Sequence, residues 1–274
     1  ITSKNNNLVK QFRSFKGGSS RKDKNFFCIE GTHLMEELLK SGNLPSRILI
    51  TEKWLKKNQN LSKQFDQSLI TLVSEEVLAS AISTVNPDGI AALVEISSIP
   101  TYQFNAKDDF VLVLDRIQDP GNMGSLFRTA LAAGVDAIFL AGGAHPLSQK
   151  VLRASSGAVF HLPFQRFEGS EEEIINSLVK SLNKLSNVGF KIFSTSSHNK
   201  SSENPSKPYW EIDWTNPTVL ILGNEGQGIH KKIQEAFNET ITIPHNELVE
   251  SLNVACVAVP LLLERKRVAY TSNT

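Results

Sequence analysis

Five polar residues in the second half of the chain and just before it have side chains suited to chemistry that uses neither a metal nor a cysteine. They are Asn122, Arg128, Glu225, Ser251 and Asn253. Amides and hydroxyls can orient a substrate, and an arginine or a glutamate supplies a fixed charge at a reacting centre. Each also has an ordinary interpretation: a helix cap for the first asparagine and the serine, a surface charge for the arginine, a solvated loop position for the glutamate and a buried amide for the last asparagine.

Signatures of other chemistries are absent from the sequence. The six histidines have no paired spacing, so no metal is expected. Neither a G-x-S-x-G nucleophile elbow nor a lysine-bearing phosphate loop occurs. The G-x-G-x-x-G dinucleotide pattern is also missing, which disfavours a nucleotide-dependent oxidoreductase. Cys28 and Cys256 have apolar neighbours and are predicted to be buried thiols, and the lack of a disulfide framework predicts a cytoplasmic protein.

Three strand-like runs lead into polar loops that contain the five residues. Val219–Leu222 precedes the glycine loop Gly223–Gly228, Thr240–Ile243 precedes Pro244, and the continuous apolar run Phe110–Leu114 precedes the first loop. The carboxyl ends of parallel strands meet at one edge of an open α/β sheet, where such sheets bind small molecules. The three loops are therefore expected to converge on one site.

Helices alternate with these strands, which predicts an α/β fold with a mostly parallel sheet. Asn122 is predicted to cap a helix from Met123 to Ala133, and Gly134 to end it. The other elements expected here are strands at Ala137–Leu140, Phe160–Phe164 and Phe190–Ser194, and helices at Val151–Val159 and Glu171–Leu185.

At 274 residues the chain is long enough for two domains with separate cores. The predicted division is a basic arm over residues 1–24, a small α/β domain over 25–97, a linker over 98–109 and the larger α/β domain over 110–274. No apolar run approaches the roughly 18 residues that span a membrane, and no signal-peptide pattern is present at the start.

The basic arm concentrates positive charge. Residues 1–24 contain seven Lys or Arg and one Asp, whereas the rest of the chain contains 22 basic and 27 acidic residues. A basic arm on a slightly acidic body suggests a polyanionic partner. A solvated tail is the equal alternative.

The order of the three loops resembles that of a known family. Asn122-x-Gly-x-x-x-Arg128, Gly223-x-Glu-x-x-Gly228 and Pro244 followed by Ser251-Leu-Asn-Val254 resemble the three motifs of the SpoU (TrmH-type) RNA ribose 2′-O-methyltransferases of the SPOUT superfamily. The stretch Phe27–His33 resembles the ribosomal-protein-like RNA-binding domain of the members that modify rRNA. The resemblance implies a SPOUT-type parallel sheet with helices on both faces and a trefoil knot, preceded by a small α/β domain.

The resemblance also implies a function: RNA methylation, in which an enzyme transfers a methyl group from S-adenosyl-L-methionine to a ribose 2′-OH. Ribosomal RNA is the expected substrate, and rRNA processing the expected context. Family members act as homodimers in which the equivalent of Arg128 enters the partner's site. The residues implied to bind the cofactor are Thr195, Gly223, Asn224, Gly228, Ile243, Ser251 and Leu252.

The family's chemistry assigns roles to the five polar residues. Arg128 is a poor general base because a guanidinium normally stays protonated. Its expected role is to hold a phosphate beside the target and to stabilise the developing alkoxide charge. Base catalysis by Arg128 stays an open alternative. The two asparagines would orient Arg128 or the ribose, Glu225 would hold its loop or pair with Arg128, and Ser251 would contact the site.

The sequence departs from the family pattern at His245, where methionine is usual, at Glu247, where glycine is expected, and at Pro260, inside the last helix. The departures at His245 and Glu247 leave open a catalytically idle RNA-binding or ribosome-assembly protein. Within the enzyme class, a tRNA 2′-O-methyltransferase is the other alternative.

Overall fold

The computed structural model describes residues 1–16, 25–196, 205–246 and 248–272, which belong to two compact units. Unit 1 consists of Ile1–Pro100 and Leu147–His161, and unit 2 of Thr101–Pro146 and Leu162–Thr274. The first boundary lies inside the predicted linker, but the sequence did not predict that residues 147–161 pack with the N-terminal part. No helix in the described ranges has the length and apolarity needed to cross a membrane.

Unit 1 is built on a four-stranded sheet in the order β1-β4-β2-β3. β4 pairs antiparallel with β1 and β2, and β2 pairs parallel with β3. The strands are β1 (Phe26–Glu30), β2 (Arg47–Ile50), β3 (Ile70–Leu72) and β4 (Ile90–Glu95). The helices are α1 (Asn7–Arg13), α2 (Thr32–Lys40), α3 (Glu52–Lys57), α4 (Gln59–Ser62), α5 (Glu75–Ala81) and α7 (Gln149–Ser155), with 3-10 turns at Gln67–Leu69, Ile96–Ser98 and Ala158–Phe160.

Part of the predicted arm belongs to the core of unit 1. Val9 and Phe12 on α1 are fully buried, and α1 packs against α5. The Arg13 guanidinium donates through Nε to the Ser80 carbonyl at 3.1 Å, so it too is used inside the unit. Residues 17–24, which hold three of the basic side chains, lie outside the described residues.

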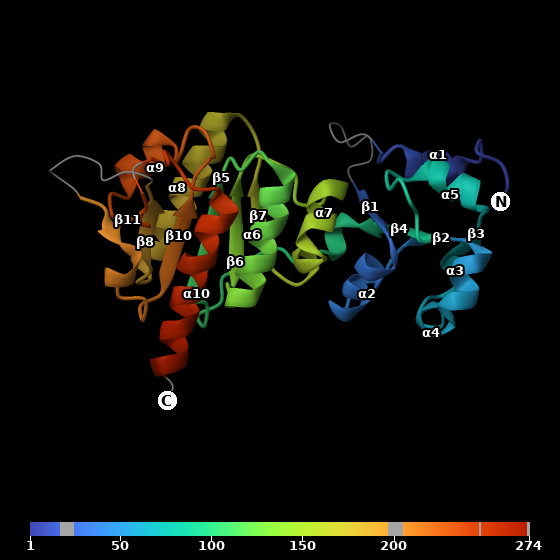
Figure 1. Ribbon diagram of the computed structural model, residues 1–274, viewed down its shortest axis with the longest axis horizontal. Helices are drawn as coiled ribbons and strands as arrows, with labels where there is room; N and C mark the ends of the chain where they lie inside the picture. The colour runs from blue at the N-terminus through green and yellow to red at the C-terminus, as the bar shows by residue number, and fades with distance from the viewer. Residues whose placement is uncertain (17–24, 197–204, 247, 273–274) are drawn as a thin grey trace. The chain divides into compact units, whose positions relative to one another are not determined.

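Unit 2 contains a seven-stranded sheet in the order β7-β6-β5-β10-β8-β11-β9, and all its pairs are parallel (Figure 1). The central strands are continuous apolar runs because helices cover both faces. The strands are β5 (Phe110–Asp115), β6 (Ala137–Ala141), β7 (Phe164–Phe167), β8 (Lys191–Thr195), β9 (Lys207–Pro208), β10 (Thr218–Leu222) and β11 (Thr240–Thr242).

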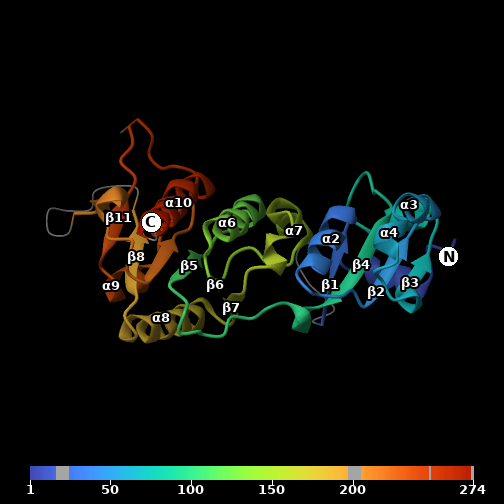
Figure 2. The ribbon, with the colours of Figure 1, turned by 90° about the horizontal axis from the view of Figure 1, so that it is seen from below.

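Two helical layers enclose this sheet. Figure 2 shows α6 (Pro120–Ala133) and α10 (Val254–Ser272) on one face and α8 (Glu171–Asn187) on the other. α8 buries Ile175, Leu178 and Leu182 against the sheet, and a capping box formed by Ser170 and Glu173 starts it. α9 (Lys231–Ala236) and a 3-10 turn at Tyr209–Glu211 complete the unit. The predicted α/β fold class is confirmed, and the knot stays a prediction.

Some element boundaries differ from the predicted ones. The helix expected over Val151–Val159 is α7 followed by a 3-10 turn, and the strand expected at Phe160–Phe164 begins at Phe164 instead. Pro260 lies inside the continuous helix α10. Because proline has no N–H, the carbonyl four residues earlier lacks its usual helical donor.

Candidate functional site

The first loop is fixed by a cap other than the predicted one. Asp119 precedes α6, and its Oδ1 accepts from the Asn122 N–H at 2.7 Å, while Pro120 takes the first helical position. The prediction that Asn122 caps this helix is therefore wrong. Its side-chain amide is instead available for contacts outside the helix.

Two asparagine amides connect helix α10 to the glycine loop. Asn253 Oδ1 accepts from the N–H groups of Ala255 at 2.9 Å and Cys256 at 3.3 Å. Asn253 Nδ2 donates to Asn122 Oδ1 at 3.1 Å. Asn122 Nδ2 in turn donates to Glu225 Oε1 at 3.0 Å. We call Asn253, Asn122 and Glu225 the amide bridge.

The amide bridge has a fixed direction. Backbone N–H groups can only donate, so they fix the Asn253 oxygen toward α10 and its NH₂ toward Asn122. The same logic directs the Asn122 NH₂ at Glu225, whose Oε1 accepts the hydrogen bond. Asn253, and not Ser251, is thus the capping residue of α10, and its side chain is exposed rather than buried.

A cavity of about 470 Å³ lies beside the bridge at the ends of β8, β10 and β11. Its volume is within the range of small-molecule sites. Its walls are the whole glycine loop, the strand end at Thr195 and the loop before α10. All seven residues predicted to bind the cofactor line it: Thr195, Gly223, Asn224, Gly228, Ile243, Ser251 and Leu252.

The glycine loop brings its backbone close to this cavity for steric reasons. A Cβ at Gly223 would come within 2.5 Å of the Gly228 carbonyl carbon and the Ile229 nitrogen, so a side chain there would force the loop apart. Gly228 adopts φ +68°, a left-handed conformation that favours glycine. The cavity can accept a ligand recognised by backbone groups, such as S-adenosyl-L-methionine.

Arg128 is placed differently from the other predicted residues. It is exposed on α6, does not line the cavity, and forms no hydrogen bond or ion pair with the described part of the chain. Glu225 lines the cavity but is bonded to Asn122, so the pairing of Glu225 with Arg128 is not found. The structure thus brings together Asn122, Glu225 and Asn253, with Ser251 on the cavity wall.

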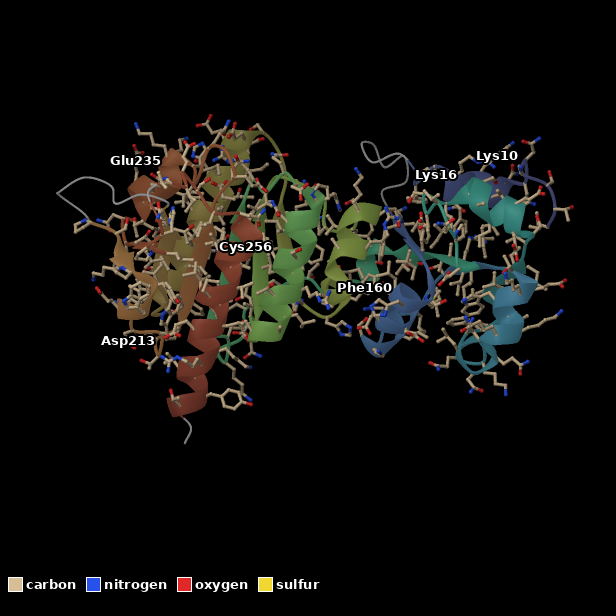
Figure 3. The ribbon with its side chains drawn as sticks, in the orientation of Figure 1. Lys10, Lys16, Phe160, Asp213, Glu235 and Cys256 are labelled. Carbon is tan, nitrogen blue, oxygen red and sulfur yellow. The ribbon has the colours of Figure 1, made fainter. Side chains whose placement is uncertain are left out.

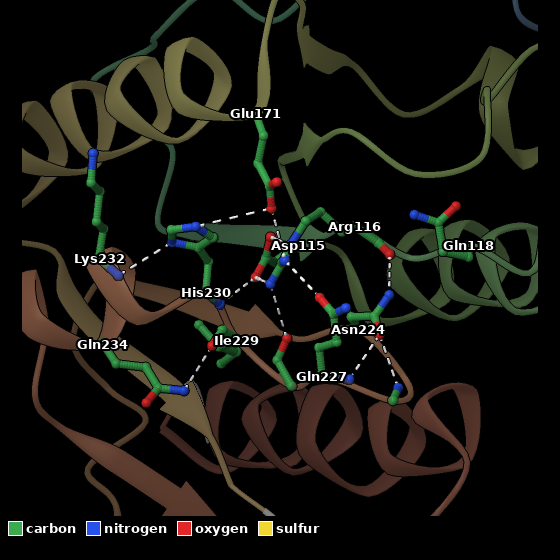
Figure 4. A network of polar contacts seen from close by, with 12 residues as sticks. Asp115, Arg116, Gln118, Glu171, Asn224, Gln227, Ile229, His230, Lys232 and Gln234 are labelled. Carbon is green, nitrogen blue, oxygen red and sulfur yellow. Dashed lines mark hydrogen bonds and ion pairs between the residues drawn. The ribbon is translucent and has the colours of Figure 1, made fainter.

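The sequence analysis missed a second polar group behind the glycine loop (Figure 4). The fully buried carboxylate of Asp115 accepts from Arg116 and from the His230 N–H. Arg116 also reaches Gln227 and Glu171. The only local signal was a charged pair at the end of a buried strand. Gln234 and Glu250 also line the cavity and were not predicted to do so. Of the departures from the family pattern, His245 lines the cavity, and Glu247 lies outside the described residues.

The two cysteines differ in environment. Cys28 is buried, as predicted, and burial raises the pKa of its thiol well above its ordinary value. Cys256 is exposed on α10, so its predicted burial is wrong (Figure 3). Its apolar sequence neighbours are split between the two faces of the helix.

Comparison with known proteins covers both units. The family model described as SpoU rRNA Methylase family matches residues 109–263, and the one described as MRM3-like substrate binding domain matches residues 6–92. A Synechocystis relative named an uncharacterized tRNA/rRNA methyltransferase is 37% identical over 100% of this chain and 96% of its own length. The Bacillus subtilis 23S rRNA (guanosine(2553)-2′-O)-methyltransferase RlmP is 32% identical over 96% of this chain and 97% of its own length.

A solved structure agrees with these matches. The crystal structure of an AdoMet-bound rRNA methyltransferase from Sinorhizobium meliloti has a TM-score of 0.79 and 26% identity, and covers 97% of each chain. The predicted enzyme class and the predicted cofactor, S-adenosyl-L-methionine, are confirmed. Because the methylase model matches more than half of its length, this chain belongs to the SpoU rRNA methylase family.

Proposed function

We propose that this chain methylates a ribose 2′-hydroxyl of ribosomal RNA, using S-adenosyl-L-methionine bound in the cavity beside the amide bridge. The observation that carries the proposal is that the glycine loop, the strand end at Thr195 and the loop before α10 enclose one cavity, while Glu225 on its wall is bonded to Asn122 of the first loop. Methyl transfer requires such an arrangement, because a donor pocket must adjoin groups that hold the acceptor in line.

The cofactor supplies an electrophilic methyl group. The chain's own residues must position the ribose hydroxyl and stabilise charge as its proton leaves. Arg128 has no competing partner in the described residues and can hold a phosphate next to the target. A guanidinium next to the target ribose also stabilises the negative charge that develops on the 2′-oxygen as its proton leaves. The amide bridge holds Glu225, and through it the glycine loop, at a fixed distance from α6 and α10.

A homodimer could bring Arg128 to the partner's cavity, because the arginine is exposed on α6 and does not line the cavity of its own chain. Apolar residues on the same layer support a second copy as the partner. Val259, Leu263 and Tyr270 on α10 are 42%, 43% and 71% exposed, and Leu131 on α6 is 38% exposed. Exposed apolar stripes of this kind are typical of protein interfaces, and isologous contacts are the commonest solution.

Ribosomal RNA is favoured as the substrate over tRNA. The matched substrate-binding domain covers residues 6–92, and RlmP, aligned over almost the whole chain, is named for 23S rRNA. Within unit 1 a polar cavity of about 860 Å³ is lined by Lys40, Lys56 and Lys57, cations suited to phosphate contacts. RNA as substrate, together with two free thiols, supports the cytoplasm as the location.

The proposal is tested by transfer of labelled methyl groups from S-adenosyl-L-methionine to total RNA from cells that lack this protein. Mapping of ribose methylation should then find one new 2′-O-methyl group in rRNA. A modified tRNA would overturn the substrate assignment. Cofactor binding without transfer to any RNA, including assembly-stage ribosomal particles, would favour the idle RNA-binding alternative.

Substitution of Arg128 tests its role. Arg128→Ala should reduce transfer about 10²-fold or more, the cost of losing one charge-stabilising donor. Because the arginine is assigned to the RNA phosphate and the developing alkoxide rather than to the cofactor, the Kd for the cofactor in the isolated protein should stay within about twofold. Arg128→Lys keeps the charge but loses the planar fork, and should be intermediate. Full activity in the alanine variant would contradict the assigned role.

A further inference from the structure

Arg116 has an unusual backbone conformation for its residue type. It follows β5 directly and has φ +56°, in the left-handed region that side chains other than glycine seldom occupy. Such strain persists only where surrounding contacts hold it, and it points to a constraint at that position. Here the contacts come from Asp115, whose two oxygens accept from Arg116 Nε at 2.9 Å and Nη2 at 3.2 Å.

The same guanidinium holds the glycine loop from behind. Arg116 Nη1 donates to Gln227 Oε1 at 3.1 Å, and Nη2 approaches the Gly228 carbonyl at 3.4 Å (Figure 4). Nη1 also bonds Glu171 Oε1 at 3.1 Å, in the first turn of α8. One side chain thus connects a central strand, a helix start and the glycine loop. The hydrogen bond to Asp115 raises the pKa of Arg116, so its charge is permanent.

Two further contacts attach the loop to residues 115 and 116. The Arg116 carbonyl accepts from Asn224 Nδ2 at 2.8 Å, and Asn224 Oδ1 accepts from the N–H groups of Gly226 and Gln227 at 2.9 Å. At the far end, the His230 N–H donates to Asp115 Oδ2 at 2.7 Å. These contacts therefore hold the loop near its start at Asn224, near its end at Gln227 and Gly228, and just after its end at His230.

The residues that hold the glycine loop from behind lie outside the cavity. All residues of the loop from Gly223 to Gly228 line the cavity, whereas Asp115, Arg116 and Glu171 do not. A loop with three glycines has little conformational preference of its own and loses much entropy when a ligand orders it. Contacts that fix it in advance lower that cost and increase affinity.

We propose that Arg116 is a positioning residue that preorganises the glycine loop for cofactor binding, acting through Gln227 and Gly228. The inference rests on the proposed function to the extent that the cavity binds S-adenosyl-L-methionine. It predicts that losing the guanidinium weakens cofactor binding, while the transfer step is unaffected once the cofactor is bound.

The test compares Arg116→Gly with wild type in the full-length protein. Glycine removes the guanidinium but suits φ +56°, so the backbone is relieved rather than strained. The Kd for S-adenosyl-L-methionine should rise about tenfold or more, and kcat at saturating cofactor should stay within about twofold. Arg116→Lys, which retains charge without the fork, should recover part of the affinity. A Kd within twofold of wild type in the folded glycine variant would overturn the proposal.

Lys232→Ala is the matched control, because it breaks a neighbouring exposed ion pair, Lys232 with Glu172, without touching the loop. It should leave the Kd unchanged. Should the glycine variant fail to fold, Gln227→Ala keeps the pair of Asp115 and Arg116 and must still weaken binding, or the proposal fails.

Hydrogen exchange of the cofactor-free protein separates this inference from the proposed function. The glycine variant should exchange faster than wild type at residues 224–230, whether or not wild type binds S-adenosyl-L-methionine. Unchanged exchange there would refute the positioning role, whereas absent cofactor binding in wild type would refute only the assigned ligand.

Discussion

The amide bridge gives an ordered electrostatic connection from a helix start to a carboxylate. The N–H groups of the first turn of α10 carry partial positive charge, and Asn253 accepts from two of them. Asn253 then donates an N–H to Asn122, and Asn122 donates an N–H to Glu225. Glu225 therefore accepts a hydrogen bond from an amide that is itself polarised by its neighbour. Each asparagine in the bridge both accepts and donates, and an aspartate of equal size, when ionised, could only accept.

Asn253→Asp should separate capping from bridging. The carboxylate still accepts from Ala255 and Cys256 and caps α10, but it cannot donate to Asn122. The Asn122 amide must then turn its NH₂ toward position 253 and present its oxygen to Glu225. We expect methyl transfer to fall at least about tenfold, with a thermal midpoint within a few degrees of wild type.

Asn253→Ala is the control for this variant. It loses the cap as well as the bridge and should cost about 1 kcal/mol of stability. Transfer at the wild-type rate by the aspartate variant would show that the direction of the bridge has no role in the reaction.

Many site residues could be predicted from the sequence because the motifs occur in the order typical of the family. The motifs did not indicate which side chains contact one another. The lining positions from Thr195 to Leu252 were expected from the family resemblance, and all seven lie on one cavity. Arg116 escaped notice because its partners Gln227 and Gly228 lie more than 100 residues away. A charged pair after a strand has no periodicity that would reveal such contacts.

At the level of elements, strands buried on both faces were the easiest to predict. β5, β6 and β10 are uninterrupted apolar runs, and the observed bounds differ from the predicted ones by one residue at most. The helix α1 was missed because its charge dominated the interpretation. Yet Leu8, Val9 and Phe12 have helical spacing, and Asn6 accepts from the Leu8 N–H as a cap.

Asp136 links the starts of β6 and β5 and should make stability depend on pH. Its Oδ2 accepts from the Asp109 and Phe110 N–H groups at 2.9 Å, while burial raises the pKa of the carboxyl. A raised pKa means that the folded state disfavours the carboxylate, so ionisation costs stability at neutral pH. Asp136→Asn keeps an acceptor and removes this cost. Its melting temperature should exceed that of wild type at pH 7, and the difference should shrink as the pH falls through the raised pKa.

Asp213 is the control with the opposite sign. Hydrogen bonds from Thr215 lower the pKa of its carboxyl, so the carboxylate stabilises the fold above the unfolded pKa, and this contribution is lost as the pH falls through the folded pKa. Asp213→Asn should therefore be less stable than wild type at pH 7. If Asp136→Asn, like Asp213→Asn, lowers the melting temperature at pH 7, the assignment for Asp136 is wrong.

At the level of the whole molecule, Arg128 and the cavity must act across two chains if the proposed homodimer is right. One variant, Arg128→Ala, lacks the arginine but has an intact cavity. A second, Gly226→Trp, adds a large side chain at a position that lines the cavity, and we expect it to block cofactor binding. Among the described residues, an added Cβ at Gly226 has only Asn224 Oδ1 within 4 Å, at 3.7 Å, so the loop backbone can accept the substitution. Each homodimer alone should be inactive.

Mixing the two variants distinguishes the two arrangements. After equal amounts exchange subunits at random, the two homodimers and the mixed dimer form in the ratio 1:1:2, so about half of the dimers are mixed. In a mixed dimer the intact cavity of one chain meets the intact Arg128 of the other, so one of its two sites works. Methyl transfer should therefore recover to about one quarter of the wild-type rate per chain. If Arg128 instead served its own cavity, no site in the mixture would be complete and transfer would stay at background. A mixture that stays inactive, although size-exclusion chromatography with light scattering shows dimers and tagged subunits co-purify, would reject the shared site.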